Sequence, residues 1–314
     1  MVPLHLLTGF LGSGKTTLLR RVLGDPAMAD TAVIVNEFGE IGLDHHLVTP
    51  LTEAVVLLKS GCLCCSIRQD LAQGLRDLLA QREAGTVPAF GRIVLETTGL
   101  ADPGPILTTL AANPSVAGLV RPGAIVTTVD GVHGERQLDG RREPLRQAAL
   151  ADRLVVTKSD LATPAAIAAL VARLRRINPS ATMHDAVAEP SEPAALFADP
   201  PAGSRAPSPT PDDHGHDHRI RSVALEALRP LDWRRTIAWL GRLTDEEGAR
   251  ILRCKGILDI AGQDRPVVIH GVHHHFYPPT LLERWPGLRR SQLVFILEDW
   301  PALGLLGGLA ACEA

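Results

Sequence analysis

The sequence lacks a strong excess of charge and a long hydrophobic run, and both absences narrow the classes of protein it can represent. Its 314 residues carry a formal net charge of -3, which gives no general case for binding nucleic acid. The apolar stretch at 301–314 is shorter than the roughly 20 residues of a membrane-spanning helix. The N-terminal stretch has no basic start of the kind found in signal peptides. We therefore expect a cytoplasmic protein with neither a nucleic-acid nor a membrane partner.

Cysteine and aromatic residues are also scarce, at five cysteines and 4% aromatics. Three of the five cysteines nevertheless fall in "GCLCC" at 61–65. In a reducing compartment such thiols are metal ligands or redox groups rather than structural disulfides, and adjacent cysteines bridge only with strain. The chain has 45% hydrophobic residues, enough for a sizeable core in one large and one small domain.

What the chain does have is a regular alternation of apolar strands and helices in its first part. Such alternation, with strands apolar on both faces, predicts an α/β fold with a mostly parallel sheet flanked by helices. The expected strands are 3–9, 31–39, 54–61, 91–99, 123–131 and 152–160, and the expected helices are 15–25, 67–83, 103–113, 143–151 and 163–178.

The composition changes near residue 189, where proline, alanine, serine and aspartate become frequent. Such a stretch is typical of a linker. Beyond it, strands are expected at 219–228, 249–260, 266–276 and 291–299, with a helix at 231–243. We therefore predict a P-loop domain at 1–188, a Pro/Ser/His-rich linker at 189–218 and a smaller α+β domain at 219–314.

The stretch "GFLGSGKT" at 9–16 matches the phosphate-binding pattern GxxxxGK[ST]. It follows an expected strand and opens an expected helix, which is the context that the pattern requires. Glycines let backbone N–H groups turn toward phosphates, and the helix N-terminus favours anions. Lys15 can reach the outer phosphates, and the Thr16 hydroxyl can ligate Mg²⁺.

A second motif, "TKSD" at 157–160, ends a later strand. The Asp160 carboxylate can accept hydrogen bonds from the two neighbouring N–H groups of guanine, which adenine does not offer. Lys158 can lie along the base and brace the phosphate loop. Thr157 stands where many GTPases have asparagine. Together with the P-loop, the motif favours GTP as the nucleotide.

Acidic residues follow two other strands. Glu96 can hold Mg²⁺ or its water, and Gly99 can offer its N–H to the γ-phosphate. Glu37, Glu40 and Asp44 lie in a glycine-containing stretch that suits a nucleotide-sensitive segment. The predicted catalytic residues are Lys15, Thr16, Glu96 and Asp44. The predicted nucleotide-binding residues are Gly9, Gly12, Ser13, Gly14, Lys15, Thr16, Thr17, Gly99, Thr157, Lys158 and Asp160.

In their order, "GFLGSGKTT", "VNEFGEIGLD", "SGCLCCSIRQDL", "VLETTGLADP" and "TKSD" resemble the CobW-like metal-chaperone GTPases, relatives of UreG and HypB. The resemblance is strong over the first ~185 residues, and "KGILDI" and "VVIHGVHHHFYPP" are more loosely similar to the family's C-terminal domain. It implies hydrolysis of GTP, with Mg²⁺, coupled to delivery of a transition metal to a client metalloprotein. It also implies that the protein can form a nucleotide-dependent homodimer.

The resemblance further implies that Cys62, Cys64 and Cys65 bind the transported metal. Thiolates suit Zn²⁺, and Co²⁺ fits the same set. Three thiolates leave the site open for a water, Glu37 or a histidine, which suits a transferable ion. Because Cys62 and Cys64 are two residues apart, an extended chain points them the same way, whereas Cys65 joins them only where the chain turns.

Two histidine clusters remain open to interpretation. His214, His216 and His218 in the linker are either a metal-loading tract or merely polar linker residues. In "HGVHHHF" at 270–276 a continuous strand would place His273 and His275 on one face. A surface histidine ladder is the more common meaning of that pattern.

Two other functions fit parts of the sequence. A P-loop small-molecule kinase would bind ATP more tightly than GTP, and would make "TKSD" coincidental. A non-catalytic zinc store or thiol sensor would show no metal-stimulated turnover. The leading hypothesis is a GTP-hydrolysing metallochaperone whose Cys-x-Cys-Cys motif carries zinc or cobalt.

Overall fold

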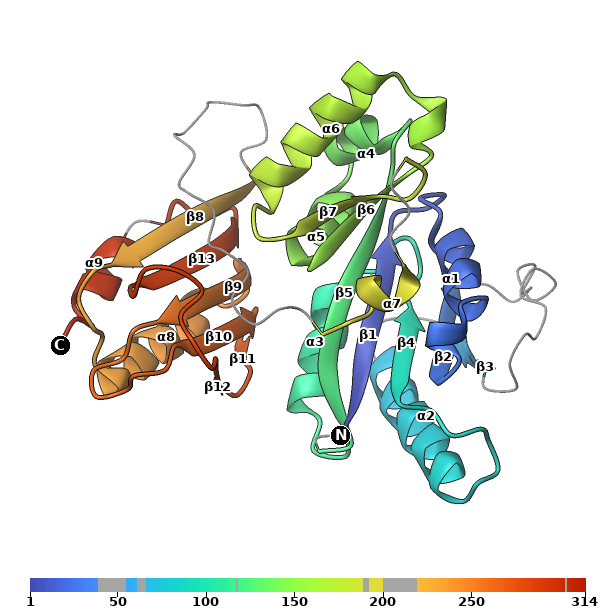
Figure 1. The fold of residues 1–314 in the computed structure, drawn as a ribbon, viewed down its shortest axis with the longest axis horizontal. Coiled ribbons are helices and arrows are strands. Elements are labelled where there is room, and N and C mark those ends of the chain that lie inside the picture. The colour runs from blue at the N-terminus through green and yellow to red at the C-terminus, as the bar shows by residue number, and fades with distance from the viewer. Residues whose placement is uncertain (39–54, 61–65, 117, 189–191, 200–218, 303) are drawn as a thin grey trace. The chain divides into compact units, whose positions relative to one another are not determined.

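The computed structural model describes residues 1–38, 55–60, 66–116, 118–188, 192–199, 219–302 and 304–314 (Figure 1). The chain forms two compact units. One comprises Met1–Val171 and Thr182–Asp199, and the other Ala172–Ala181 and Pro200–Ala314. Within the described residues, no helix combines the length and the apolar character needed to cross a membrane.

A seven-stranded sheet in the order β3-β2-β4-β1-β5-β6-β7 forms the centre of the first unit. Each of its neighbouring pairs is parallel, which confirms the predicted α/β architecture. The strands are β1 Val2–Gly9, β2 Thr31–Phe38, β3 Val55–Ser60, β4 Arg92–Glu96, β5 Val120–Asp130, β6 Arg153–Thr157 and β7 Thr182–Asp185. The helical segments are α1 Lys15–Leu23, η1 Pro26–Met28, α2 Ser66–Glu83, α3 Pro103–Ala112, α4 Gly134–Gly140, α5 Arg142–Leu150, η3 Ser159–Leu161, α6 Pro164–Ile177 and α7 Pro193–Leu196.

Helices cover both faces of this sheet, as neighbouring residues of β5 show. Val126 packs in a buried cluster with Leu18 and Leu19 of α1. The next residue, Thr127, points to the opposite face, because side chains alternate along a strand, and donates a hydrogen bond to the backbone oxygen of Gln147 in α5 at 3.0 Å. Strands covered on both faces are apolar throughout, which explains the continuous hydrophobic runs of the sequence.

The segment 192–199 belongs to the first unit, although its composition suggests a linker. Leu196 and Phe197 are almost fully buried in the cluster that contains α1. The Phe197 ring stands edge-on to that of His5, with centroids 5.9 Å apart, and Asp199 forms an ion pair with Arg121. Two apolar residues among prolines and alanines are enough to anchor the segment, but they produce no periodic signal in the sequence.

The second unit contains an antiparallel sheet in the order β11-β10-β9-β13-β8, with β12 paired to β10. Its core includes Trp239, whose ring contacts Phe295 edge-on at 6.1 Å between centroids. The expected α+β character of this region is confirmed. The elements are β8 Ile220–Ala227, α8 Trp233–Glu247, β9 Ile251–Leu258, β10 Val267–Val272, β11 His275–Phe276, β12 Thr280–Leu281, β13 Ser291–Glu298 and α9 Leu305–Ala310.

The continuous strand predicted over 266–276 is wrong. β10 ends at Val272, which pairs with His275 of β11, so His273 and His274 form a tight turn between the two strands. His273 has a φ of 51°, the left-handed conformation that such turns require. His274 contacts the backbone oxygen of Thr244 at 2.7 Å. The turn therefore removes the strand alternation that would have aligned His273 with His275.

The carboxyl ends of the first unit's strands define the edge at which a ligand is expected in a parallel sheet. β1 leads into the P-loop, and β5 and β6 end at Asp130 and Thr157, which are paired in the strand register. β4 ends at Glu96, which is level with Leu7 of β1 and with Val35 of β2. Residues far apart in the sequence thus arrive at one edge of the sheet.

Candidate functional site

The P-loop has the backbone geometry that phosphate binding requires. Gly12 and Gly14 have φ angles of 73° and 91°, which residues with a Cβ rarely adopt. The Ser13 N–H bonds to the Phe10 oxygen at 3.0 Å, and α1 begins directly afterward at Lys15. The loop therefore presents a curved backbone at a helix N-terminus, which is an anion site by construction.

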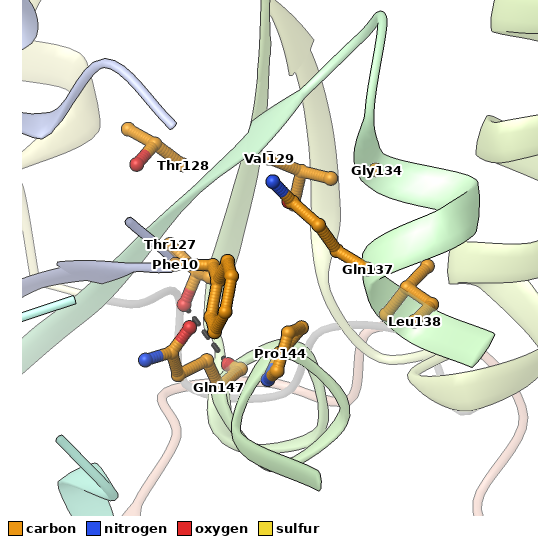
Figure 2. Close-up of a pocket in the computed structure, with 9 residues that line it drawn as sticks. All are labelled: Phe10, Thr127, Thr128, Val129, Gly134, Gln137, Leu138, Pro144 and Gln147. Carbon is orange, nitrogen blue, oxygen red and sulfur yellow. Dashed lines mark hydrogen bonds between the residues drawn. The ribbon is translucent and has the colours of Figure 1, made fainter. Parts of the chain in front are cut away.

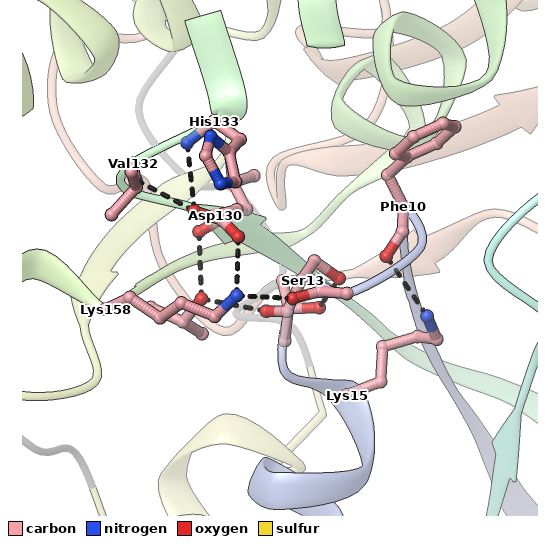
Figure 3. A network of polar contacts seen from close by, with 11 residues as sticks. Phe10, Ser13, Lys15, Asp130, Val132, His133 and Lys158 are labelled. Atoms are coloured by element: carbon pink, nitrogen blue, oxygen red, sulfur yellow. Dashed lines mark hydrogen bonds and ion pairs between the residues drawn. The ribbon is translucent and has the colours of Figure 1, made fainter. Parts of the chain in front are cut away.

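Lys15 is held inside this loop. It is buried, and its Nζ donates to the Gly9 and Phe10 backbone oxygens at 2.9 and 3.2 Å (Figure 3). Burial lowers the pKa of the Lys15 ammonium, and the nearby Glu96 carboxylate opposes that shift. The side chain is thus placed at the loop, as the motif predicts.

Thr16 and Glu96 come together across 80 sequence positions. The Thr16 hydroxyl donates to Glu96 Oε1 at 3.2 Å. A hydroxyl and a carboxylate next to a phosphate loop are hard oxygen ligands of the kind that Mg²⁺ prefers. These two residues fit the magnesium ion expected with a nucleoside triphosphate.

The "TKSD" motif clamps the P-loop from the neighbouring strand. Thr157 Oγ1 donates to the Ser13 oxygen at 2.8 Å, and Lys158 Nζ donates to the Gly12 oxygen at 2.8 Å. The hydroxyl of Thr157 therefore reaches the loop even though asparagine is more common at this position. Asp160 follows in η3 and is exposed, so its carboxylate is open to a base.

Asp130 is a site residue that the motif search missed. Its Oδ2 accepts from Lys158 Nζ at 2.6 Å, and its Oδ1 accepts from the N–H groups of Val132 and His133 at 2.8 and 3.0 Å (Figure 3). Burial alone would raise the pKa of Asp130, but the Lys158 hydrogen bond and the backbone donors hold it below its ordinary value. The only sequence signal was an aspartate followed by glycine at a strand end.

Gly99 lies directly against the P-loop. A Cβ at this position would stand 2.7 Å from the Leu11 backbone nitrogen, so no larger residue fits without movement. The segment begins with Thr97, whose N–H bonds to the Leu7 oxygen at 2.9 Å and whose hydroxyl bonds to that of Thr8 at 2.9 Å. Gly99 therefore lies in direct contact with the P-loop residue Leu11, and its contact with a terminal phosphate stays a prediction.

Several predicted residues lie outside the described residues. These are Asp44, Glu40, Cys62, Cys64, Cys65, His214, His216 and His218. For Glu37 only the strand position is described. Among described side chains, no group of three histidine, cysteine, aspartate or glutamate residues could hold a metal ion.

The strand register locates the end of β3, the strand that precedes the cysteine stretch in the sequence. Val35 of β2 is level with Leu57 of β3, and Glu37 with Lys59. β3 ends at Ser60, at the same carboxyl edge as β1 and three strands from it, and the cysteine stretch comes next in the sequence. At about 4.8 Å between neighbouring strands, the end of β3 is about 14 Å from that of β1.

The sequence matches two family descriptions. One, the CobW/HypB/UreG nucleotide-binding domain, matches residues 3–185. The other, the cobalamin synthesis protein cobW C-terminal domain, matches residues 220–313.

Full-length relatives and a solved structure are also similar. The zinc chaperone YjiA of Escherichia coli (strain K12) is 33% identical over 276 residues, covering 86% of each chain. The zinc chaperone CobW of Pseudomonas aeruginosa is 30% identical over 313 residues, covering 88% of this chain and 81% of the relative. The crystal structure of Zn(II)-bound YjiA GTPase from E. coli superimposes with a TM-score of 0.76 at 28% identity, covering 100% of this chain and 99% of the other.

Proposed function

The chain belongs to the CobW/HypB/UreG family of nucleotide-binding proteins, and on that premise we propose that it is a GTP-hydrolysing zinc chaperone. The observation that carries this proposal is the clamp between the "TKSD" motif and the P-loop, made by Thr157 and Lys158. It joins a guanine-type base site to a phosphate site. The zinc-chaperone names of two relatives support the metal.

In the proposed nucleotide site, a few side chains bind the phosphates, the magnesium ion and the base. Lys15 and the N-terminus of α1 stabilise the phosphate charge. Thr16 and Glu96 hold Mg²⁺, which when bound neutralises charge that develops between the β- and γ-phosphates. Asp160 reads the base, while Lys158 keeps the base site joined to the loop.

We assign the transported zinc to the thiolates of Cys62, Cys64 and Cys65, with Glu37 as the fourth ligand. The support is chemical: thiolates are preferred zinc ligands, and three thiolates leave one of zinc's four positions for a further ligand such as Glu37. The strand order supports nearness to the nucleotide, since β3, the strand before this stretch in the sequence, ends at the same sheet edge as β1. Free thiols of this kind require a reducing compartment, so the proposed location is the cytoplasm.

Delivery to a client metalloprotein and assembly into a nucleotide-dependent homodimer are further parts of the proposal. Both rest on the family likeness. Size-exclusion chromatography with light scattering, in GDP and in a non-hydrolysable GTP analogue, tests the dimer. A single mass in both states contradicts it.

The experiment that tests the function compares nucleotides and cysteine variants under anaerobic conditions. We expect GTP to bind more tightly than ATP, because adenine leaves the Asp160 carboxylate unpaired. We expect a Cys64→Ser variant to lose zinc affinity while GDP affinity is kept, and a Cys254→Ser variant to serve as the control, since Cys254 is fully buried in the second unit. ATP preference would favour a kinase, and zinc binding without any GTP turnover would favour a zinc store.

A further inference from the structure

The segment 97–102 connects β4 to α3 and touches the P-loop. Its Gly99 leaves no room for a Cβ against Leu11, as the 2.7 Å clearance to the Leu11 nitrogen shows. Leu100, in contrast, is 51% exposed. Because Gly99 approaches the P-loop this closely, a small shift of its backbone would change the contact with Leu11. The backbone of the segment therefore needs support from another element.

Helix α5 supplies that support through two consecutive residues. The Gln147 side-chain amide donates from Nε2 to the backbone oxygens of Gly99 and Ala101, at 3.2 and 3.0 Å. Arg146 forms an ion pair with Asp102, whose other carboxylate oxygen accepts from the N–H of Gly104 at the start of α3. The segment is therefore held by α5 at Gly99, Ala101 and Asp102.

Gln147 is itself fastened to the strand next to the P-loop. Its backbone oxygen accepts from Thr127 Oγ1 at 3.0 Å, and the following residue, Thr128, bonds through its hydroxyl to Ser13 Oγ at 2.7 Å. Figure 2 shows Gln147 beside Thr127 and Phe10. Gln147 thus connects the 97–102 segment with β5, the strand whose Thr128 hydroxyl bonds to Ser13 of the P-loop.

The environment of Gln147 is costly for a residue that only fills space. It is 1% exposed, and its Oε1 has no hydrogen-bond partner among the described residues. It borders a cavity of about 10 Å³, room for about one water molecule. A buried amide with an unmade hydrogen bond is less favourable than an apolar side chain of the same size. Packing alone therefore does not account for a glutamine here.

We propose that Gln147 is a positioning residue that sets the Gly99 backbone for the γ-phosphate of GTP. This inference rests on the proposed GTPase function. With the Gly99 carbonyl held by the Gln147 amide and its Cα confined against Leu11, Gly99 has little freedom to turn, so its N–H keeps one direction. A γ-phosphate bound in the loop then meets an N–H group that is already aligned, which is the condition for effective electrostatic stabilisation. GDP has no γ-phosphate and does not sense this alignment.

The test is a Gln147→Met variant, which keeps the length of the side chain and removes the amide. We expect kcat/KM for GTP to fall about tenfold, which corresponds to about 1.4 kcal/mol of lost interaction. GDP affinity is expected to stay unchanged, and it also reports that the variant is folded. Gln137→Met is the matched control, because Gln137 lines the same cavity from α4 and should change neither quantity.

A Gln147→Asn variant keeps the amide but is one methylene too short to reach both carbonyls, so the same loss is expected in a second folded protein. Equal losses for GTP and GDP, or no loss for GTP, would overturn the role of Gln147. Wild-type protein without any GTP turnover would contradict the proposed function itself, whereas wild-type turnover that both Gln147 variants retain would contradict only the positioning role.

Discussion

At the residue scale, Lys158 is the side chain that connects the base site with the phosphate loop. Its Nζ bonds to both the Gly12 oxygen and the Asp130 carboxylate, and its φ of 55° places it in the left-handed region. Asp130 is buried, and its carboxylate accepts hydrogen bonds from Lys158 Nζ and from the Val132 and His133 N–H groups. The lysine ammonium is thus oriented by the buried Asp130 carboxylate.

This orientation leads to a prediction for Asp130→Asn. The change removes the negative charge facing Lys158, and a hydrogen bond to a charged group contributes about 1.5–3 kcal/mol. We expect affinity for GTP and GDP to fall alike, by about tenfold or more, because both nucleotides carry guanine and place their phosphates in the same P-loop. Fluorescent-nucleotide titration measures it.

Asp77→Asn on the exposed face of α2 is the control for that experiment. A loss confined to GTP would contradict the assignment, since Asp130 would then act on the γ-phosphate rather than on the clamp.

A second residue-scale prediction concerns acid stability. His5 is 2% exposed, and its Nδ1 accepts from the Ala124 N–H at 2.9 Å. Burial lowers the pKa of His5 from 6.5 to about 4, so between these pH values the unfolded chain binds more protons than the folded one. The stability linked to neutral His5 is complete above about pH 6.5 and is lost as the pH falls toward 4, by about 3 kcal/mol in total.

Urea unfolding of wild-type protein and of a His5→Asn variant between pH 4 and 7.5 measures this difference. The asparagine oxygen can accept the same hydrogen bond but does not titrate, so the variant should lose less stability on acidification. The same pH slope in both proteins would show that His5 is not responsible.

At the scale of elements, the sequence predicted the long, regular parts of the fold well. The apolar runs and the P-loop context identified the parallel strands, because burial on both faces leaves an unmistakable hydrophobic pattern. The strand predicted over 266–276 was wrong because a turn at His273 and His274 interrupts it. Strand-forming composition does not exclude a two-residue turn.

Short segments escaped the sequence for a different reason. The residues 192–199 contain α7, a helix of 4 residues. Leu196 and Phe197 anchor the segment by packing in the core of the first unit. A helix of this length shows no periodicity, and its surroundings of proline and alanine resemble a linker. Tertiary contacts, such as that of Phe197 with His5, reveal that the segment is part of the first unit's core.

At the scale of the whole molecule, the sheet edge is what would allow nucleotide and zinc to influence each other. β3, which precedes the cysteine stretch in the sequence, ends at Ser60 on the same edge at which β1 ends at Gly9. We expect zinc affinity to differ between the GTP-analogue and GDP states by at least about fivefold, the lower end of usual coupling between sites. The γ-phosphate would hold the segments at this edge in one conformation, and hydrolysis of GTP would free them to adopt another.

Competition titration of zinc in both nucleotide states measures that coupling, and the reverse titration checks it. Coupling is reciprocal, so saturating zinc must change the affinity for the GTP analogue relative to GDP by the same factor. Equal zinc affinity in both states would exclude a nucleotide-controlled zinc site while leaving the site itself intact.

The sequence by itself determined the phosphate loop, the base motif and the parallel sheet, because each depends on residues that are close together in the chain or on a repeated hydrophobic pattern. Only the tertiary structure decided that Asp130 holds Lys158, 28 positions away, and that Gln147 holds Gly99, 48 positions away. Asp130 and Lys158 meet because parallel strands return to one edge after each helix, and Gln147 meets Gly99 because α5 packs beside the segment that follows β4. A lone aspartate or glutamine carries no mark of such a partner until the crossover brings the two together.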